Sequence, residues 1–118
     1  MTRALLATLA VLAAGPVAAQ DIAAGETTFR QRCAACHTVD GANRTGPTLL
    51  GVVGREAGSV EGFRYSGALA DSGLTWSAEL LEQFLENPRD MVRGTRMVQR
   101  LPSAEDRANV VGYLATLE

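Results

Sequence analysis

The side chains best suited to chemistry lie together in the stretch Cys33-Ala34-Ala35-Cys36-His37, which holds both cysteines and the only histidine of the 118 residues. On a helix, positions three and four apart share one face, so the two thiols and the imidazole would point at the same object. Two thiols at this spacing can bond the two vinyl groups of a porphyrin, and the imidazole can bind its iron. The pattern is typical of c-type haem attachment. We therefore expect one covalent haem c here, with His37 as an iron ligand.

Three other chemistries use a Cys-x-x-Cys pair, namely a thioredoxin-like redox couple, a structural disulfide and half of a zinc site. A zinc site needs further cysteine or histidine ligands, and the chain has none outside residues 33–37. A redox dithiol is expected beside a βαβ pattern, which the glycine-rich sequence after His37 does not resemble. Haem attachment is therefore the favoured interpretation, and a thiol–disulfide exchanger whose thiols are tuned by His37 stays as the alternative.

Residues 1–19 have the pattern of a secretory signal peptide. Arg3 precedes an apolar run over residues 4–14, which is shorter than the roughly 20 residues that span a bilayer. Small residues then predict cleavage between Ala19 and Gln20, and an uncleaved membrane anchor is the alternative. Export would place the mature domain, residues 20–118, in the bacterial periplasm, where an unused cysteine pair tends to close as a disulfide.

The composition bears on partners and on the core. The chain has 11 basic side chains, every one arginine, against 13 acidic ones, for a formal net charge of −2. A nucleic-acid-binding protein normally has an excess of positive charge, so we expect no nucleic acid partner. A domain of this length with few aromatic residues has little apolar volume to bury, and a haem would supply the missing core.

The spacing of apolar and capping residues predicts four helices, over residues 21–36, 66–71, 77–87 and 103–117. The first helix leads directly into the thiols, because its apolar residues recur at spacings of three and four through Ile22, Gly25 and Phe29 to Cys33 and Cys36. Gly25 lowers helix stability by about 1 kcal/mol relative to alanine, which favours a packing role at a close helix crossing. The last helix is the expected partner in that crossing.

The remaining stretches read as loops. Residues 38–62 have six glycines and several apolar residues without a sustained period, so we expect a loop wrapped over a flat apolar cofactor. Residues 87–97 read as a loop by their proline and glycine, and they hold Met91 and Met97, the only methionines besides Met1. A thioether suits the sixth position of haem iron, and no second histidine is available for it.

Over essentially its whole mature length the sequence resembles mitochondrial cytochrome c and its short bacterial periplasmic relatives, the class I c-type cytochromes. Besides residues 33–39, the similar stretches are Thr45-Gly46-Pro47, Gly51-Val52-Val53-Gly54-Arg55, Gly62-Phe63-Arg64-Tyr65, Leu74-Thr75-Trp76, Leu85-Glu86-Asn87-Pro88 and Gly94-Thr95-Arg96-Met97. The resemblance implies an all-α small cytochrome c fold, in which the N- and C-terminal helices cross and further helices and long loops wrap around one covalently bound haem.

The resemblance also implies roles for individual residues. Met97 resembles the distal iron ligand, with Met91 as the second choice, and Pro47 resembles the residue whose carbonyl accepts the ring N–H of His37. The residues around the haem propionates would be Arg55, Tyr65, Trp76 and Thr95. The contact between the terminal helices would join Gly25 and Phe29 to Val110 and Tyr113.

Two axial protein ligands would close the iron to substrates, so we expect a soluble one-electron carrier rather than an enzyme. An enzyme that consumes peroxide is the alternative if the Met97 bond is weak. The resemblance implies a monomer that takes electrons from a ubiquinol–cytochrome c reductase and passes them to a terminal oxidase or a photosynthetic reaction centre. An arginine face would steer acidic partners, and it would be formed by Arg32, Arg44, Arg89 and Arg96.

Overall fold

The computed structural model describes residue 10 and residues 20–118, so the predicted signal peptide, apart from Ala10, lies outside the described residues. The described part is helical, with α1 (Ile22–Arg32), α2 (Gly67–Ala70), α3 (Ala78–Glu86), α4 (Pro88–Met91) and α5 (Ala104–Ala115). An isolated antiparallel bridge joins Glu56 to Thr75. The all-α prediction is confirmed. Within the same residues, no helix combines the length and the apolar character needed to cross a bilayer.

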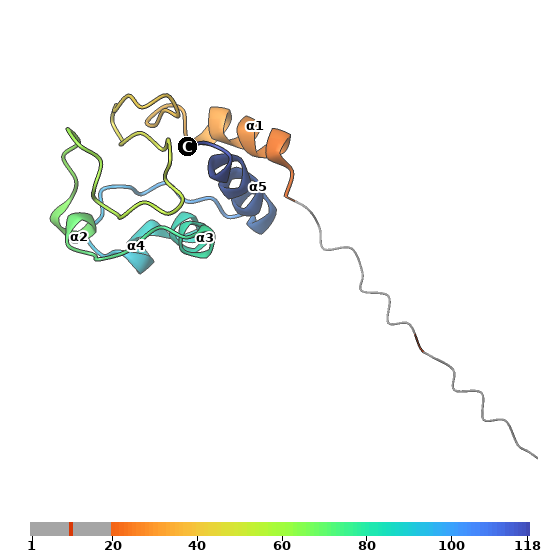
Figure 1. Cartoon of the computed structure of the whole chain (residues 1–118). Helices are drawn as coiled ribbons and strands as arrows, with labels where there is room; N and C mark the ends of the chain where they lie inside the picture. Colours follow the sequence, from red (N-terminus) through yellow and green to blue (C-terminus); the bar gives the residue numbers. More distant parts are fainter. Residues whose placement is uncertain (1–9, 11–19) are drawn as a thin grey trace, which may run out of the picture.

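The two terminal helices lie against each other (Figure 1). A Cβ atom on Gly25 would meet the backbone carbonyl of Asn109 and lie 2.9 Å from Cβ of Tyr113, so only glycine allows this close approach. The rings of Phe29 and Tyr113 pack with their centroids 6.0 Å apart. The N–H of Asp21 donates to Oδ1 of Asn109 over 3.0 Å and fastens the start of α1 to α5. The predicted crossing of the first and last helices is confirmed.

Helix α1 ends four residues earlier than predicted, at Arg32 rather than Cys36. Cys33 has the non-helical angles φ −122° and ψ −32°, and the chain continues in turns. The N–H of His37 donates to the carbonyl of Cys33 over 2.9 Å, so the segment still closes one turn. The thiols and the imidazole therefore project from a turn that follows the helix, and not from the helix itself.

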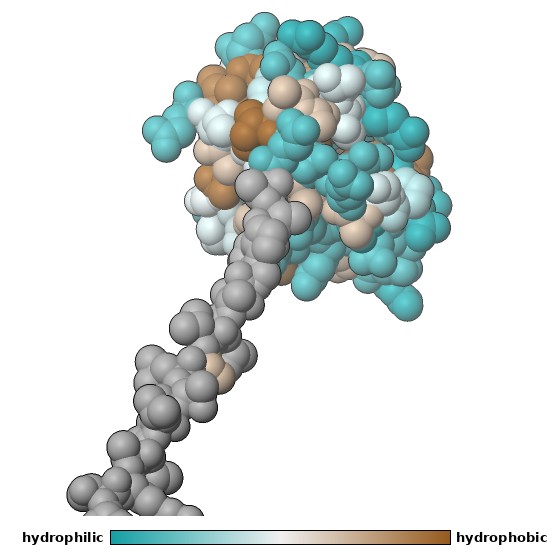
Figure 2. Space-filling model, turned by 90° about the vertical axis from the view of Figure 1, so that its right-hand side faces the viewer, coloured by the Kyte–Doolittle hydropathy of each residue, from teal (hydrophilic) through white to brown (hydrophobic). Residues whose placement is uncertain are grey.

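Ile22 was expected on the buried face of α1, and it is 41% exposed. The buried face begins at Gly25, where α1 first meets α5, and continues with Phe29. The end of the molecule that carries these two helices faces the viewer in Figure 2, and its surface is mostly hydrophilic with small separate hydrophobic areas. Such a distribution is typical of a surface in contact with water.

Helices α2 and α3 agree with the predictions to within a residue at each end. The hydroxyls of Ser66 and Ser77 accept the backbone N–H three residues on and cap the two helices. In α3, Leu81 and Phe84 are buried. The indole of Trp76, just before the cap, packs on Phe84 with ring centroids 5.0 Å apart. Helix α3 thus presents an apolar face toward the centre of the domain.

Residues 87–97 were predicted as a loop, and they contain the short helix α4. Pro88 occupies its first turn, where a missing N–H is harmless and a fixed φ is helical. Asn87, with an extended φ of −157°, separates α3 from α4. The chain then runs without helix from Val92 to Ser103, and Gly94 adopts a φ of +91° in that stretch. Met91 consequently belongs to a helix and Met97 to a segment without regular secondary structure.

Candidate functional site

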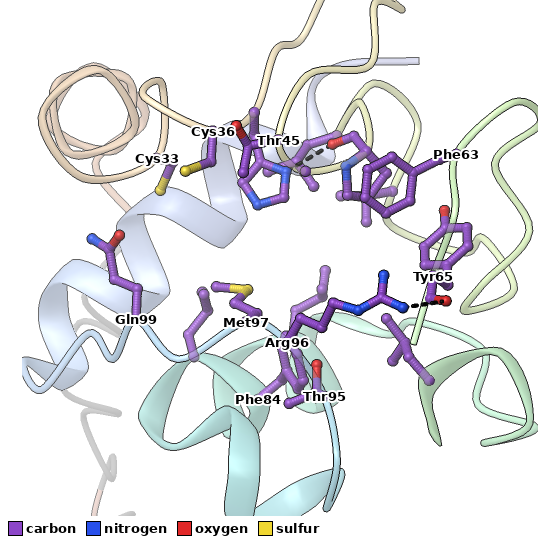
Figure 3. Close-up of a pocket in the computed structure, with 18 of the residues that line it drawn as sticks. Cys33, Cys36, Thr45, Phe63, Tyr65, Phe84, Thr95, Arg96, Met97 and Gln99 are labelled. Carbon is purple, nitrogen blue, oxygen red and sulfur yellow. Dashed lines mark hydrogen bonds between the residues drawn. The ribbon is translucent and has the colours of Figure 1, made fainter. Parts of the chain in front are cut away.

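A cavity of about 720 Å³ lies between the loops, α3 and α5. Its size is that of a small-molecule site, for which roughly 300–1,000 Å³ is usual. Cys33 and Cys36 lie on one side of it and Met97 on the other (Figure 3). The structure brings all nine sequence-predicted site residues to its lining, namely Cys33, Cys36, His37, Pro47, Arg55, Tyr65, Trp76, Thr95 and Met97.

The inner wall of the cavity is apolar. It includes core residues from the long loop, α3 and α5, namely Val52, Leu81, Phe84, Val110 and Leu114. A close-packed interior has few voids larger than a water molecule, so a cavity of this size among core residues indicates the place of a large apolar ligand.

The two thiols are free and differ in environment. Cys36 is exposed, whereas Cys33 is half-buried. Burial raises the pKa of Cys33 to about 11, with Arg32 acting in the opposite direction and Cys36 adding to the rise. Because the thiolate is the attacking species in disulfide exchange, a thiol with such a pKa is poorly suited to it at neutral pH. This environment disfavours Cys33 as the attacking thiol of an exchanger.

The imidazole of His37 has a defined tautomer. Its Nδ1 lies 2.7 Å from the carbonyl oxygen of Pro47, which can only accept, so Nδ1 carries the proton. Burial lowers the pKa of His37; the Pro47 bond opposes this shift and Arg55 adds to it, so the ring is held neutral. A Cβ atom on Gly46 would collide with the ring, which therefore rests on a glycine backbone. The remaining nitrogen, Nε2, keeps a lone pair for a metal.

The structure separates the two candidate methionines. Met97 lines the main cavity, and its sulfur faces the side that carries the thiols (Figure 3). Met91 is not among the residues that line this cavity. It packs against the core from α4 and borders a different, smaller hollow with Gln83 and Arg100. Only Met97 is placed to meet a ligand held by Cys33 and Cys36.

Arg55 introduces a positive charge at the polar end of the cavity. Its Nη1 donates to the carbonyl of Leu50 over 3.1 Å, and its buried Nε has no hydrogen-bond partner among the described residues. Burial lowers the pKa of the guanidinium, and Tyr65 acts in the opposite direction. Tyr65 and Thr95 lie beside the same space (Figure 3). An orphaned buried donor in a cavity calls for an acceptor from a ligand, and an anionic one fits best.

The four arginines of the predicted docking face do not form one uniform group. Arg32, Arg44 and Arg96 are exposed at the cavity, whereas Arg89 lies on α4 away from its lining. The guanidinium of Arg96 donates to the carbonyls of Arg64 and Tyr65, over 2.8 and 3.3 Å. Arg96 therefore also ties the segment before Met97 to the neighbouring loop.

Sequence reasoning missed Thr48, which is buried next to Pro47. Its hydroxyl accepts two backbone N–H groups, from Gly41 and Leu50, each over 3.2 Å. Its own N–H donates to Oδ1 of Asn43 over 3.0 Å. These bonds hold the loop that presents the Pro47 carbonyl. Nothing in the local sequence signals this role, because the partners come from three separate positions of the loop.

These features fit a haem. Cys33 and Cys36 can form its thioether bonds, and the lone pair of His37 Nε2 and the sulfur of Met97 suit the two axial positions of its iron. The apolar wall matches the flat ring, and the unsatisfied Nε of Arg55 matches a carboxylate at its edge. Each chemical group of the cofactor thus meets a side chain of the matching kind.

Comparisons with known proteins agree with this geometry. The family model for cytochrome c matches residues 22–118. The chain is 48% identical over 98 residues to the cytochrome c-type cyt cy of Rhodobacter capsulatus, covering 82% of this chain and 49% of that protein, so it spans about half of that relative. It is 43% identical to cytochrome c2 of Rhodomicrobium vannielii, covering 96% of this chain and 92% of that one.

Among solved structures, cytochrome cH from Methylobacterium extorquens superposes with a TM-score of 0.77 at 43% identity, covering 81% of this chain and 98% of that one. The chain therefore belongs to the cytochrome c family, whose members carry electrons on one covalently bound haem c.

Proposed function

We propose that this chain is a one-electron carrier in which Cys33 and Cys36 hold the haem through thioether bonds and His37 and Met97 bind its iron from opposite sides. The observation that carries the proposal is the convergence of these four side chains on one cavity with apolar walls. When bound, the haem supplies an iron that alternates between Fe(III) and Fe(II).

The two axial side chains set the properties of the site. The Nδ1–H of His37 donates to the Pro47 carbonyl, which orients the ring and makes Nε2 a more basic ligand. The thioether of Met97 is soft and neutral, and it raises the reduction potential relative to a second imidazole. With the haem bound, the apolar wall would limit the access of water and would favour the lower charge of the iron. These residues would therefore have opposing effects on the reduction potential. His37 would favour Fe(III), whereas Met97 and the apolar wall would favour Fe(II).

The polar end of the cavity would hold the carboxylates of the haem. Arg55 offers the buried Nε that lacks a partner, and Tyr65, Trp76 and Thr95 line the same cavity. A buried guanidinium next to carboxylates forms strong charge-assisted hydrogen bonds. These contacts would fix the cofactor at the end opposite to its apolar edge.

Two protein ligands on the iron leave no open coordination position, and on that basis the chain is not an enzyme. The reduced holoprotein should neither bind carbon monoxide nor turn over peroxide at neutral pH. Rapid peroxide turnover by a protein whose Met97 is shown spectroscopically to remain bound would contradict the closed site.

The proposed location is the periplasm, after cleavage of a signal peptide at Ala19/Gln20. Two observations support it. The leader has the charge and apolar pattern of a signal peptide. The match to the cytochrome c2 of Rhodomicrobium vannielii covers 96% of the chain, a share that reaches into residues 1–19. The mature chain would act as a monomer.

The proposed partners are membrane complexes, with a ubiquinol–cytochrome c reductase as donor and a terminal oxidase or a photosynthetic reaction centre as acceptor. The docking face would consist of Arg32, Arg44, Arg89 and Arg96. Three of these surround the cavity, where an electron would enter and leave. Electrostatic steering predicts that association with an acidic partner slows as salt is added. Association rates that do not change with salt would contradict the proposed docking face.

The main experiment is expression in a host with a functional haem-attachment system. We expect the visible absorption to remain with the polypeptide through acid–acetone extraction, because the thioether bonds are covalent. A spectroscopic redox titration should follow a one-electron Nernst curve. A colourless product with two free thiols would instead favour the exchanger.

A further inference from the structure

Met97 belongs to a stretch, residues 92–103, that contains no helix. Within the described part of the chain, neither the N–H groups nor the carbonyls of residues 96–100 pair with other backbone groups. Val98 is 56% exposed, so burial does not fix the middle of the stretch either. Met97 nevertheless directs its sulfur toward the side of the cavity that carries the thiols (Figure 3). Contacts at the two ends of the stretch must therefore hold Met97 in place.

The part of the stretch that follows Met97 is fixed to the end of α3. The N–H of Leu101 donates to the carbonyl of Leu85 over 2.8 Å, and Nε of Arg100 donates to the carbonyl of Glu86 over 3.0 Å. The last four carbonyls of a helix have no partner inside the helix. The residues that follow Met97 thus provide donors for two of these carbonyls of α3.

The end of α3 also lacks a positive charge of its own. The helix has three glutamates, at positions 79, 82 and 86, and no basic side chain. The C-terminal end of a helix dipole is negative, and Glu86 adds a charge of the same sign there. Arg100 lies 14 residues further along the chain and brings a cation to this end. The position of Arg100 therefore has an electrostatic reason as well as a hydrogen-bonding one.

We infer that Arg100 is a positioning residue for Met97, whose sulfur it keeps in the cavity by joining the stretch to the last carbonyl of α3. The inference rests on the proposed function, in which Met97 binds the iron. Helix α3 also contributes Leu81 and Phe84 to the wall of the same cavity. Another ligand can reach the iron from this side only after Met97 moves away. That movement separates Arg100 from α3, so loss of the hydrogen bond should make Met97 easier to displace.

Two substitutions separate the hydrogen bond of Arg100 from its charge. In Arg100→Gln the amide nitrogen takes the place of Nε along the side chain, so a donor remains and the charge is removed. In Arg100→Met a side chain of similar length loses both. Imidazole is titrated into the ferric holoproteins at high salt, which screens exposed charges. Its apparent affinity should be about twofold to tenfold higher in Arg100→Met than in Arg100→Gln or the parent, because one hydrogen bond fewer opposes the departure of Met97.

The control is Arg93→Met, at an exposed arginine of the same stretch for which no side-chain hydrogen bond is found among the described residues. It should leave the imidazole affinity unchanged. Equal imidazole affinities in the two Arg100 variants would overturn the positioning role, and a difference between them in the thermal midpoint alone would reduce Arg100 to a contribution to stability. A ferric parent protein without the absorption band of a thioether bound to Fe(III) would instead overturn the proposed iron ligand.

Discussion

Nδ1 of His37 lies 2.7 Å from the carbonyl oxygen of Pro47, ten residues further along the chain. This bond decides which nitrogen of the ring is free, and so it couples the iron ligand to the loop that follows it. The carbonyl is positioned by Thr48, whose hydroxyl and N–H bind other parts of the same loop. The conformation of that loop should therefore affect the electronic properties of the iron.

Thr48→Val tests this coupling because it keeps the shape of the side chain and removes the hydroxyl. Two partly buried N–H groups, of Gly41 and Leu50, lose their acceptor. Because each such hydrogen bond contributes about 0.5–1.5 kcal/mol, the free energy of unfolding should fall by about 1–3 kcal/mol. A weaker His37–Pro47 bond makes the imidazole less basic, so the midpoint potential should rise. Redox titration and thermal unfolding measure the two effects.

The matched control is Thr27→Val on α1, where an exposed hydroxyl donates to the carbonyl of Ala23. That change should leave the potential unaltered. A Thr48→Val protein with the parent potential would mean that the Pro47 carbonyl is held by the backbone alone.

Met97→Ala should remove the upper iron ligand. Loss of the thioether should lower the midpoint potential by on the order of 0.1 V, within the roughly 0.8 V that axial ligands control, and it should open the iron to carbon monoxide. Met91→Ala is the control, because Met91 packs from α4 outside the cavity. It should lower stability by about 2 kcal/mol and leave the iron spectrum unchanged. If Met91→Ala changes the iron spectrum and Met97→Ala does not, then Met91 and not Met97 is the upper iron ligand.

Much of the site could be predicted because its chemistry is local in sequence. Cys33, Cys36 and His37 lie within five residues, so any compact backbone brings them together. The error in the predicted end of α1, which lies at Arg32, therefore did not affect the prediction that these three side chains are neighbours. The end of α1 was predicted too late because apolar residues keep a helical spacing through both cysteines. Helix α4 was missed because Pro88 marks both the end of one helix and the first turn of the next.

The choice between Met91 and Met97 could not be made from composition, since both lie in one stretch of eleven residues. It depends on tertiary packing, which turns α4 toward the core and the following segment toward the cavity. The role of Thr48 was missed for the same reason. Its bonds close only when residues 38–50 are folded, and sequence spacing does not report such contacts.

Arg55→Met should lower the midpoint potential. A half-buried cation near the iron favours Fe(II), and a unit charge about 10 Å away at an effective dielectric of about 20 contributes roughly 1.7 kcal/mol, or about 70 mV for one electron. Arg44→Met is the control, because Arg44 lies at the same cavity but is exposed, so water and salt screen its charge. Redox titrations of both variants at low and high salt separate the effect of the buried Arg55 charge from that of the screened Arg44 charge. Equal shifts in both variants would mean that the burial of Arg55 has no electrostatic consequence.

Gly25→Ala should disrupt the crossing of α1 and α5. The added methyl group would meet the Asn109 carbonyl, which belongs to helix backbone and cannot move aside cheaply. We expect a loss of about 1–3 kcal/mol in the free energy of unfolding, measured by thermal denaturation of the oxidised holoprotein. Gly67→Ala should be neutral or stabilising by up to about 1 kcal/mol, because the new methyl would meet no atom within 4 Å beyond its chain neighbours and its own helix backbone. If both variants unfold at the parent temperature, the helices have room to separate, and the contact between them contributes little to the stability of the haem-bound domain.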